Sequence, residues 1–243
     1  MSLLSPGHEL MFNECCVLVT GGAGALGQAV VAYFENHGAR VAVIDYSDEI
    51  IDGAFASKSD DNIYLACDLT QRKSCEQAVA AIMESFGQID ILCNIAGGFL
   101  MGEDVHETSD ETWDFLFNLN SRSILNMGSA VVPVMLAAGS GKIVNIAARA
   151  ATTGAAKMGV YTASKAVVLR LTESMALELR HKNINVNCIL PGTIDTPRNR
   201  IDMPDADHEK WVAPGDIANV IGFLASENAI AIHGAGIPVD GLS

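Results

Sequence analysis

The chain has few aromatic and few basic residues. Aromatic side chains make up 6% of its 243 residues, and 15 Lys and Arg stand against 29 Asp and Glu, so the net charge is −14. Proteins that bind nucleic acids or anionic membranes do so through clustered Lys and Arg side chains. The basic residues here are scattered along the chain. We therefore expect neither nucleic acid nor a membrane surface as a partner.

Patterns that mark metal sites, disulfide frameworks and export are also missing. The six cysteines show no C-x-x-C spacing, and the six histidines show no H-E-x-x-H pattern. No apolar run approaches the roughly 20 residues that span a bilayer, and the first residues lack the features of a signal peptide. We expect a cytoplasmic protein with free thiols and no metal. Residues 1–13 are expected to be a disordered N-terminal segment, and residues 14–243 a single domain.

Short apolar runs that are typical of buried parallel strands recur along the whole chain. They cover residues 16–20, 40–45, 63–67, 89–94, 142–147, 185–190 and 237–239. The segments between them have the apolar spacing of helices. Strands that alternate with helices form parallel sheets through right-handed crossovers. We therefore predict a single-domain α/β Rossmann fold, whose doubly wound, mostly parallel seven-stranded sheet carries helices on both faces.

Two long helices are predicted in the second half of the chain. Thr108 and Glu111 have the spacing of a capping box, which marks a helix start. Pro133 indicates a late kink or an end of that helix. The second helix is predicted over residues 161–182.

The first predicted strand leads into the glycine-rich turn Thr-Gly-Gly-Ala-Gly-Ala-Leu-Gly at residues 20–27, which is followed by a helix. Glycines let the backbone turn tightly and approach a pyrophosphate, which then lies at the partly positive end of the helix. The predicted dinucleotide contacts in this turn are Gly21, Ala23, Gly24, Ala25 and Leu26.

Acidic residues end the second and third predicted strands. Asp45 can accept hydrogen bonds from an adenosine ribose and would repel a 2′-phosphate, and no Arg follows it. This favours NAD(H) over NADP(H). Asp68, with Leu69 beside it, is a second candidate for the adenine end, although an Asp before Leu-Thr is also a good helix cap.

Tyr161 and Lys165 form the predicted catalytic pair. Their spacing of four puts both side chains on one face of a helix. A nearby ammonium stabilises a phenolate, so we expect Lys165 to lower the pKa of Tyr161. Tyr161 would then be a general acid in reduction and a general base in oxidation.

Together these motifs resemble the short-chain dehydrogenase/reductase family. Residues 20–27 resemble its T-G-x-x-x-G-x-G turn, Asn-Ile-Ala-Gly at 94–97 its N-N-A-G, residues 161–165 its Y-x-x-x-K, and Pro191-Gly192 the P-G after its sixth strand. The motifs follow in the family's order over residues 16–241, which is nearly the full chain. The resemblance therefore implies the fold, a small-molecule substrate and a nicotinamide dinucleotide cofactor.

The resemblance also assigns further residues. It implies that Asn120 holds a proton-relay water and that Lys165 binds the nicotinamide ribose. The remaining cofactor contacts that it implies are Asn94, Ala96, Gly97, Pro191, Gly192, Ile194 and Thr196, with the last two facing the carboxamide. It further implies a homodimer or homotetramer that packs through the two long helices, residues 108–133 and 161–182.

Two residues depart from the family pattern. Ala25 replaces the middle glycine of the turn, which costs little if its φ is negative. Ala148 stands thirteen residues before Tyr161, where the family usually has a serine that donates a hydrogen bond to the substrate oxygen. Loss of one such donor slows a carbonyl reaction roughly 10²–10³-fold. The sequence offers the hydroxyl of Thr152 or Thr153 as a substitute for the missing serine hydroxyl.

Local similarity to the dihydropteridine reductase branch of the family extends over residues 24–27, 96–98, 195–200 and 203–207 and Trp211, and that branch also lacks the serine. The leading hypothesis is an NADH-dependent reductase of a small conjugated ring such as a quinonoid dihydropterin. A 3-oxoacyl reductase or an alcohol dehydrogenase-type carbonyl reductase is the alternative enzyme. A dinucleotide-binding regulatory protein with weak or lost catalysis is the alternative outside enzymes.

Overall fold

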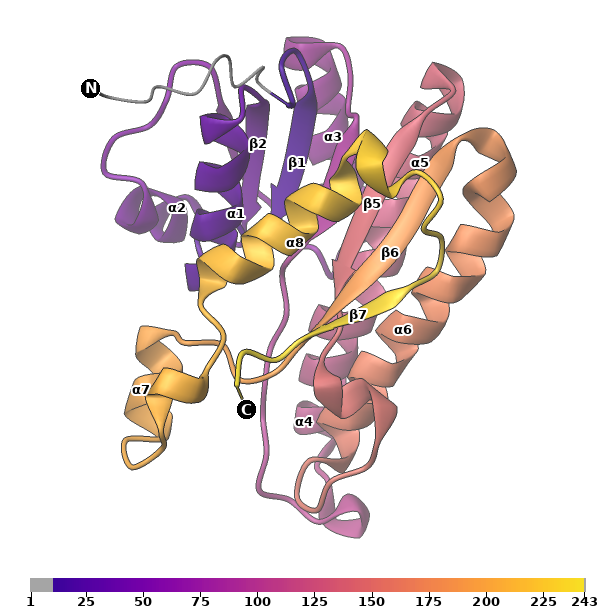
Figure 1. The fold of residues 1–243 in the computed structure, drawn as a ribbon. Helices are drawn as coiled ribbons and strands as arrows, with labels where there is room; N and C mark the ends of the chain where they lie inside the picture. The colour runs from indigo at the N-terminus through magenta and orange to yellow at the C-terminus, as the bar shows by residue number, and fades with distance from the viewer. Residues whose placement is uncertain (1–10, 243) are drawn as a thin grey trace, which may run out of the picture.

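The computed structural model describes residues 11–242, and this part of the chain forms one seven-stranded parallel sheet (Figure 1). The strand order is β3-β2-β1-β4-β5-β6-β7, and every neighbouring pair is parallel. The strands are β1 (Cys16–Thr20), β2 (Arg40–Asp45), β3 (Ile63–Ala66), β4 (Ile91–Asn94), β5 (Gly141–Ile146), β6 (Ile184–Pro191) and β7 (Gly236–Val239). The Rossmann fold is confirmed, with a sheet that is parallel throughout rather than mostly.

The strand order reverses between β1 and β4. The chain first builds outward from β1 to β3, then crosses back and builds β4 to β7 on the other side. In such sheets ligands bind in the crevice beyond the carboxyl ends of the strands at the reversal. The fold thus places Thr20 and Asn94, the last residues of β1 and β4, side by side in register at this point.

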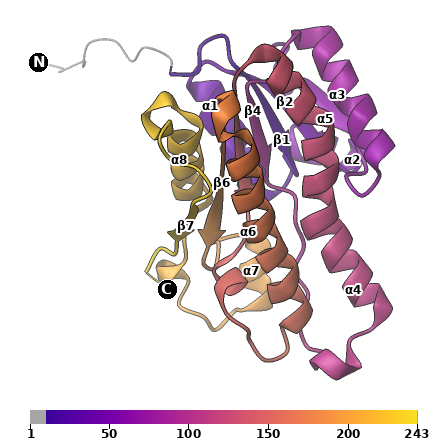
Figure 2. The same cartoon turned by 90° about the vertical axis from the view of Figure 1, so that its right-hand side faces the viewer.

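Helices cover both faces of the sheet (Figures 1 and 2). On one face, α1 (Ala25–Asn36) and α8 (Pro214–Ala225) pack against each other over a core that contains Val30, Phe34 and Ile221. On the other face, α3 (Arg72–Phe86), α5 (Ser123–Ala138) and α6 (Gly159–Leu179) pack on a second core. The remaining α-helices are α2 (Asp48–Ala54), α4 (Asp110–Phe117) and α7 (Pro197–Asp202).

The first described residues belong to the packed core. Phe12 is 3% exposed and makes an edge contact with Phe34 at 4.9 Å between ring centroids. Its N–H also donates to the His37 carbonyl at 3.0 Å. Packing therefore begins at Phe12, within the segment 1–13 predicted to be disordered. Residues 1–10 of that segment lie outside the described residues.

The long helix in the middle of the chain differs from the prediction at two points. Its cap is Ser109, whose side chain accepts from the Thr112 N–H at 3.2 Å, so the capping residue lies one position after Thr108. Pro133 does not end this helix: α5 continues to Ala138, and its C-cap is Gly139, which has a left-handed φ of 77°. Buried Met135 lies beyond the proline and holds the last turn on the core.

A π-turn, Asn118–Arg122, joins α4 to α5. Within it the Ser123 N–H donates to the Asn118 carbonyl, five residues earlier. A π-turn inserts one extra residue into a helix and often marks a functional site. Sequence periodicity gave no sign of this turn.

Within residues 11–242 no helix combines the length and the apolar character needed to cross a membrane. The same residues contain no cluster of His, Cys, Asp and Glu suited to a metal ion. All six cysteines are free, and all but Cys15 are buried. The expectation of free thiols is confirmed.

Candidate active site

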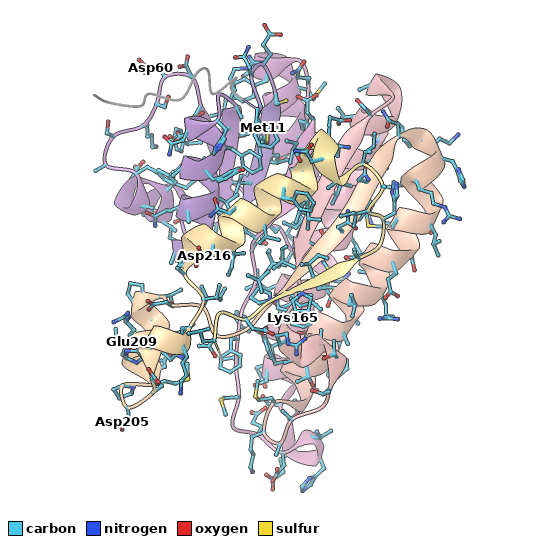
Figure 3. The ribbon with its side chains drawn as sticks, viewed as in Figure 1. Met11, Asp60, Lys165, Asp205, Glu209 and Asp216 are labelled. Atoms are coloured by element: carbon cyan, nitrogen blue, oxygen red, sulfur yellow. The ribbon has the colours of Figure 1, made fainter. Side chains whose placement is uncertain are left out.

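The predicted site residues gather at the carboxyl ends of the strands. Figure 3 shows Lys165 at this end of the molecule, with the segment that contains Asp205 and Glu209 to one side of it. The turn after β1, the loop after β4, the start of α6 and the loop after β6 all meet here. The site is therefore built by the crossover geometry of the sheet.

The glycine-rich turn is shaped to receive an anion. Gly24 is the N-cap of α1 and lends no side chain to the cap, and the first helical bond of the turn runs from the Gln28 N–H to the Gly24 carbonyl at 2.8 Å. The N–H groups of the residues between them therefore have no partner inside the helix. These free donors at a helix N-terminus fit the pyrophosphate of a dinucleotide.

Steric contacts explain the glycines of this turn. Gly21 has a left-handed φ of 64°, and a Cβ there would lie 2.7 Å from the Ala96 Cα. A Cβ on Gly27 would lie 2.7 Å from the Gly22 Cα. Ala25 is not among the residues with positive φ, so the expectation that alanine is tolerated there is confirmed.

Asp45 reaches the glycine-rich turn from the end of β2. One carboxylate oxygen accepts from the Ala23 N–H at 3.0 Å and the other from the Tyr46 N–H at 2.8 Å. The side chain is partly exposed beside the turn, as a ribose-binding carboxylate must be. Its place supports the contact predicted for it.

Asp68 and Leu69 lie at the end of β3, but they form a local turn. Asp68 accepts from the Thr70 N–H at 2.9 Å and from its hydroxyl at 2.7 Å. The Leu69 carbonyl accepts from the Asn126 side chain at 2.9 Å, which ties the turn to α5. Asp68 thus stabilises a local turn and is not the cap of α3, whose N-cap is Gln71, and its adenine contact stays a prediction.

Tyr161 and Lys165 lie one turn apart on α6, as predicted. Lys165 is 5% exposed, and its ammonium donates to the Ile146 carbonyl at 3.0 Å, at the end of β5. Tyr161 packs its ring edge-on against Phe99, with centroids 4.8 Å apart. The two side chains are held by separate partners: Lys165 by the end of β5 and Tyr161 by the loop after β4.

Burial shifts the pKa values of both Tyr161 and Lys165. It lowers the pKa of Lys165 to about 8 and raises the pKa of Tyr161 to about 12. The expectation that Lys165 lowers the pKa of Tyr161 is therefore wrong for this geometry, because desolvation of the phenol is the dominant influence. Tyr161 remains protonated across the neutral range and is ready to donate.

Asn120, in the π-turn, joins three parts of the site. Its side-chain amide donates to the Gly98 carbonyl at 3.0 Å and to the Ser164 hydroxyl at 2.9 Å, and its oxygen accepts from the Gly98 N–H at 2.8 Å. A Cβ on Gly97 would lie 2.9 Å from the Lys165 Nζ and 3.0 Å from the Asn120 oxygen. A larger residue at position 97 would therefore push the Lys165 ammonium or the Asn120 amide out of place.

A buried amide chain supports the β4 loop, and the sequence analysis missed it. Asn94 donates to the Asn145 oxygen at 2.8 Å, and Asn145 donates to the Thr172 hydroxyl at 2.9 Å. Ser164, which links Asn120 to the Tyr161 carbonyl, was also missed. The signal was present: Asn145 is polar within an apolar strand, and such a residue requires partners when it is buried.

Ala148 is 7% exposed, directly after β5, and brings no hydroxyl to the site. Neither Thr152 nor Thr153 supplies the hydroxyl that is missing at Ala148. Both are exposed on a shallow surface that they share with Ala163 and Ala166, which lie on a different side of α6 from Tyr161 and Lys165. The Thr152 hydroxyl donates to the Arg149 carbonyl at 2.9 Å.

The segment 193–212 follows β6 and lies to one side of the site (Figure 3). Its two ends are joined by the Asp195 N–H to the Val212 carbonyl at 2.9 Å and the Val212 N–H to the Thr193 carbonyl at 3.0 Å. Thr196 caps α7 by accepting from the Asn199 N–H at 3.1 Å, and the Ile194 carbonyl accepts from the Asn199 side chain at 2.8 Å. The contacts predicted for Ile194 and Thr196 with a carboxamide stay predictions.

The loop after β6 starts at the expected P-G pair. Pro191 ends β6, and the Gly192 N–H donates to the Val239 carbonyl of β7 at 3.1 Å. This bond fixes where the segment 193–212 leaves the sheet.

Comparison with known proteins adds the following. Residues 15–206 match the model of the short chain dehydrogenase family. The 7alpha-hydroxysteroid dehydrogenase of Bacteroides fragilis is 33% identical over 95% of this chain and 94% of that protein. The NAD-dependent glycerol dehydrogenase of Listeria innocua is 32% identical over 97% and 96%. The structure of an NAD+-bound xylitol dehydrogenase has a TM-score of 0.87 and 26% identity, covering 95% of this chain and 99% of that one.

Proposed function

The chain belongs to the short-chain dehydrogenase family and is an NAD(P)-dependent oxidoreductase, and from this we propose that it reduces small conjugated substrates with NADH. The observation that carries the proposal is the joint placement of Tyr161, Lys165 and Asn120 around the β4 loop, beside a position where Ala148 supplies no hydroxyl. The dinucleotide, when bound, supplies the hydride. The residues of this chain bind it and handle the proton.

We assign the cofactor to the glycine-rich turn and the catalytic end of the sheet. The free N–H groups at the start of α1 would hold the pyrophosphate, and Asp45 the adenosine ribose. Lys165 would hold the nicotinamide ribose, and Tyr161 would donate the proton from its phenol. Asn120 acts as a positioning residue because it fixes the β4 loop and Ser164, and we keep the relay water as its proposed further role.

The missing serine guides the choice of substrate. A ketone that gains hydride develops negative charge on its oxygen, and a hydroxyl donor normally stabilises that charge. In a quinonoid dihydropterin the electrons enter a conjugated C=N system, so this donor is less needed. A secondary alcohol or ketone is the second candidate, because the glycerol and 7alpha-hydroxysteroid dehydrogenases are named for alcohol substrates. The regulatory alternative is disfavoured, since the chain keeps Tyr161, Lys165 and Asn120.

The test is NADH oxidation by the purified protein with a quinonoid dihydropterin and, in parallel, with a panel of ketones. We expect turnover of the dihydropterin and at least tenfold lower kcat/KM for the ketones. Turnover confined to the ketones would replace the first candidate by the second.

The preference for NADH is tested at Asp45. Asp45→Asn keeps an acceptor for the Ala23 N–H and removes the charge that repels a 2′-phosphate. We expect the ratio of kcat/KM for NADH to that for NADPH to fall at least tenfold. Asp48→Asn, which removes the same charge from the exposed start of α2, is the matched control and should leave the ratio unchanged. An equal effect of both changes would contradict the role of Asp45.

The pH dependence follows from burial of the catalytic pair. Below about pH 8 Lys165 carries its proton, and above it the ammonium is lost, while the pKa of Tyr161 at about 12 keeps the phenol protonated throughout. We expect kcat/KM for NADH-dependent reduction to be level in the neutral range and to fall as the pH rises through 8. Because kcat/KM reports groups of the free enzyme, a profile that stays level to pH 10 would contradict this assignment.

We also propose an oligomer and a reducing compartment. Large exposed side chains lie along the helices that the resemblance assigns to the interface, including Trp113, Leu125, Leu136 and Leu177. This supports packing of α4, α5 and α6 against a second copy, as a homodimer or homotetramer, which light scattering of the purified protein would test. The six free cysteines support a cytoplasmic location.

A further inference from the structure

A cavity of about 110 Å3 adjoins Tyr161 on the side of α4. It is formed by the loop after β4, the first turn of α4 and the residues just before and at the start of α6. The apolar part of its wall comes from Leu100, Met101, Leu116, Met158 and Val160. Of the residues assigned to the cofactor, Tyr161 alone lines this cavity.

The cavity has a polar end that contains Glu103, Thr108 and Thr112. The carboxylate of Glu103 accepts from the Ser109 hydroxyl at 3.2 Å and from the Ser109 N–H at 3.4 Å. These are long bonds, and they leave carboxylate lone pairs available. Among the described residues Glu103 has no cationic partner, because the nearby Lys157 pairs with Asp104 at 2.8 Å.

The loops around the cavity are fixed to each other. Lys157 has a left-handed φ of 63°, and its carbonyl accepts from the Gly102 N–H at 2.8 Å. Gly159 leaves room for the Val105 side chain, because a Cβ on this glycine would overlap it. A non-glycine residue with left-handed φ is sparsely populated and persists where the surroundings require it. The cavity is therefore held open by specific contacts.

We propose that this cavity is the subsite for the aminopyrimidine ring of the substrate, with Glu103 accepting hydrogen bonds from its N–H edge. The inference rests on the proposed function and extends it to one substrate class. The Glu103 carboxylate keeps lone pairs that can accept further N–H donors, and the amino group and ring N–H of a pterin present two of them side by side.

The same geometry discriminates against other substrates. A carboxylate or phosphate at this end would face the Glu103 carboxylate, and the cationic side chain that lines the cavity, Lys157, is already paired with Asp104 at 2.8 Å. A plain quinone would fill the apolar part and leave the carboxylate unsatisfied. Polar sites that are built for a donor reject analogues that lack it by large factors.

The test compares Glu103→Gln with the wild type on two substrates, a quinonoid dihydropterin and a benzoquinone. We expect kcat/KM for the dihydropterin to fall 10- to 100-fold, mainly through KM, while benzoquinone reduction stays within twofold. Glu107→Gln is the matched control, because this exposed side chain on the same segment does not line the cavity. Equal losses on both substrates, or no loss on either, would overturn the subsite.

Binding is measured separately, by calorimetry with oxidised biopterin in the presence of NAD+. We expect the wild type to bind and Glu103→Gln to bind at least tenfold more weakly. Absence of binding to the wild type overturns the subsite whatever the turnover results. NADH oxidation with ketones or quinones in that case would leave the proposed oxidoreductase function intact, so the two failures are distinguishable.

Discussion

Tyr161→Phe is expected to lower kcat roughly 10²–10⁴-fold, the range that general acid catalysis contributes. The phenylalanine keeps the edge contact with Phe99 and the backbone bond between the Tyr161 carbonyl and Ser164. Only the proton donor is lost. NADH affinity, measured by fluorescence titration, should change less than twofold.

The matched control for this change is Tyr46→Phe. Tyr46 is 69% exposed and lies after β2, away from the catalytic end of α6. The same hydroxyl is removed there, and kcat should be unaffected. Retention of more than a tenth of the wild-type kcat by Tyr161→Phe would show that another group supplies the proton.

Gly27→Ala is expected to abolish tight cofactor binding. The new Cβ would overlap the Gly21 carbonyl oxygen and lie 2.7 Å from the Gly22 Cα, so the backbone of the turn must move. Overpacking of this kind costs about 1–3 kcal/mol of stability. Movement of the turn also displaces the N–H groups that we propose hold the pyrophosphate. We expect NADH affinity to fall at least 100-fold, together with a lower melting temperature.

Gly53→Ala provides the comparison. Gly53 lies in α2, and a Cβ there meets nothing within 4 Å. Alanine is favoured over glycine inside a helix by about 0.5–1 kcal/mol, so this variant should bind NADH normally and melt no earlier than the wild type. Normal NADH affinity in Gly27→Ala would mean that the turn does not hold the dinucleotide.

The strands could be predicted closely from the sequence because parallel strands that are buried on both faces are continuous apolar runs. The predicted bounds of the first two, residues 16–20 and 40–45, coincide with β1 and β2. The helix cap was placed one residue early because Thr108 and Ser109 are adjacent hydroxyl residues, and tertiary contacts decide between them. Ser109 is selected by its bonds to Glu103 as well as to Thr112.

The chemical properties of the site residues were harder to predict than which residues form the site. Spacing alone puts Tyr161 and Lys165 on one helix face, and the structure agrees. Spacing gives no information on desolvation, which reverses the expected pKa shift of the phenol. The bonds that join Asn120 to Gly98 and Ser164 connect segments far apart in the chain, so no local pattern reveals them.

The π-turn at Asn118–Arg122 interrupts a regular helix at the point where Asn120 bonds to Gly98 and Ser164. Deleting one residue there would let the helix run uninterrupted from Asp110 to Ala138. One residue corresponds to about 100° of rotation, so Asn120 would swing off Gly98 and Ser164. A chain one residue shorter would thus have a regular helix and would lose the bonds that hold Asn120 to the β4 loop and to α6, so the length of this segment matters as well as its composition.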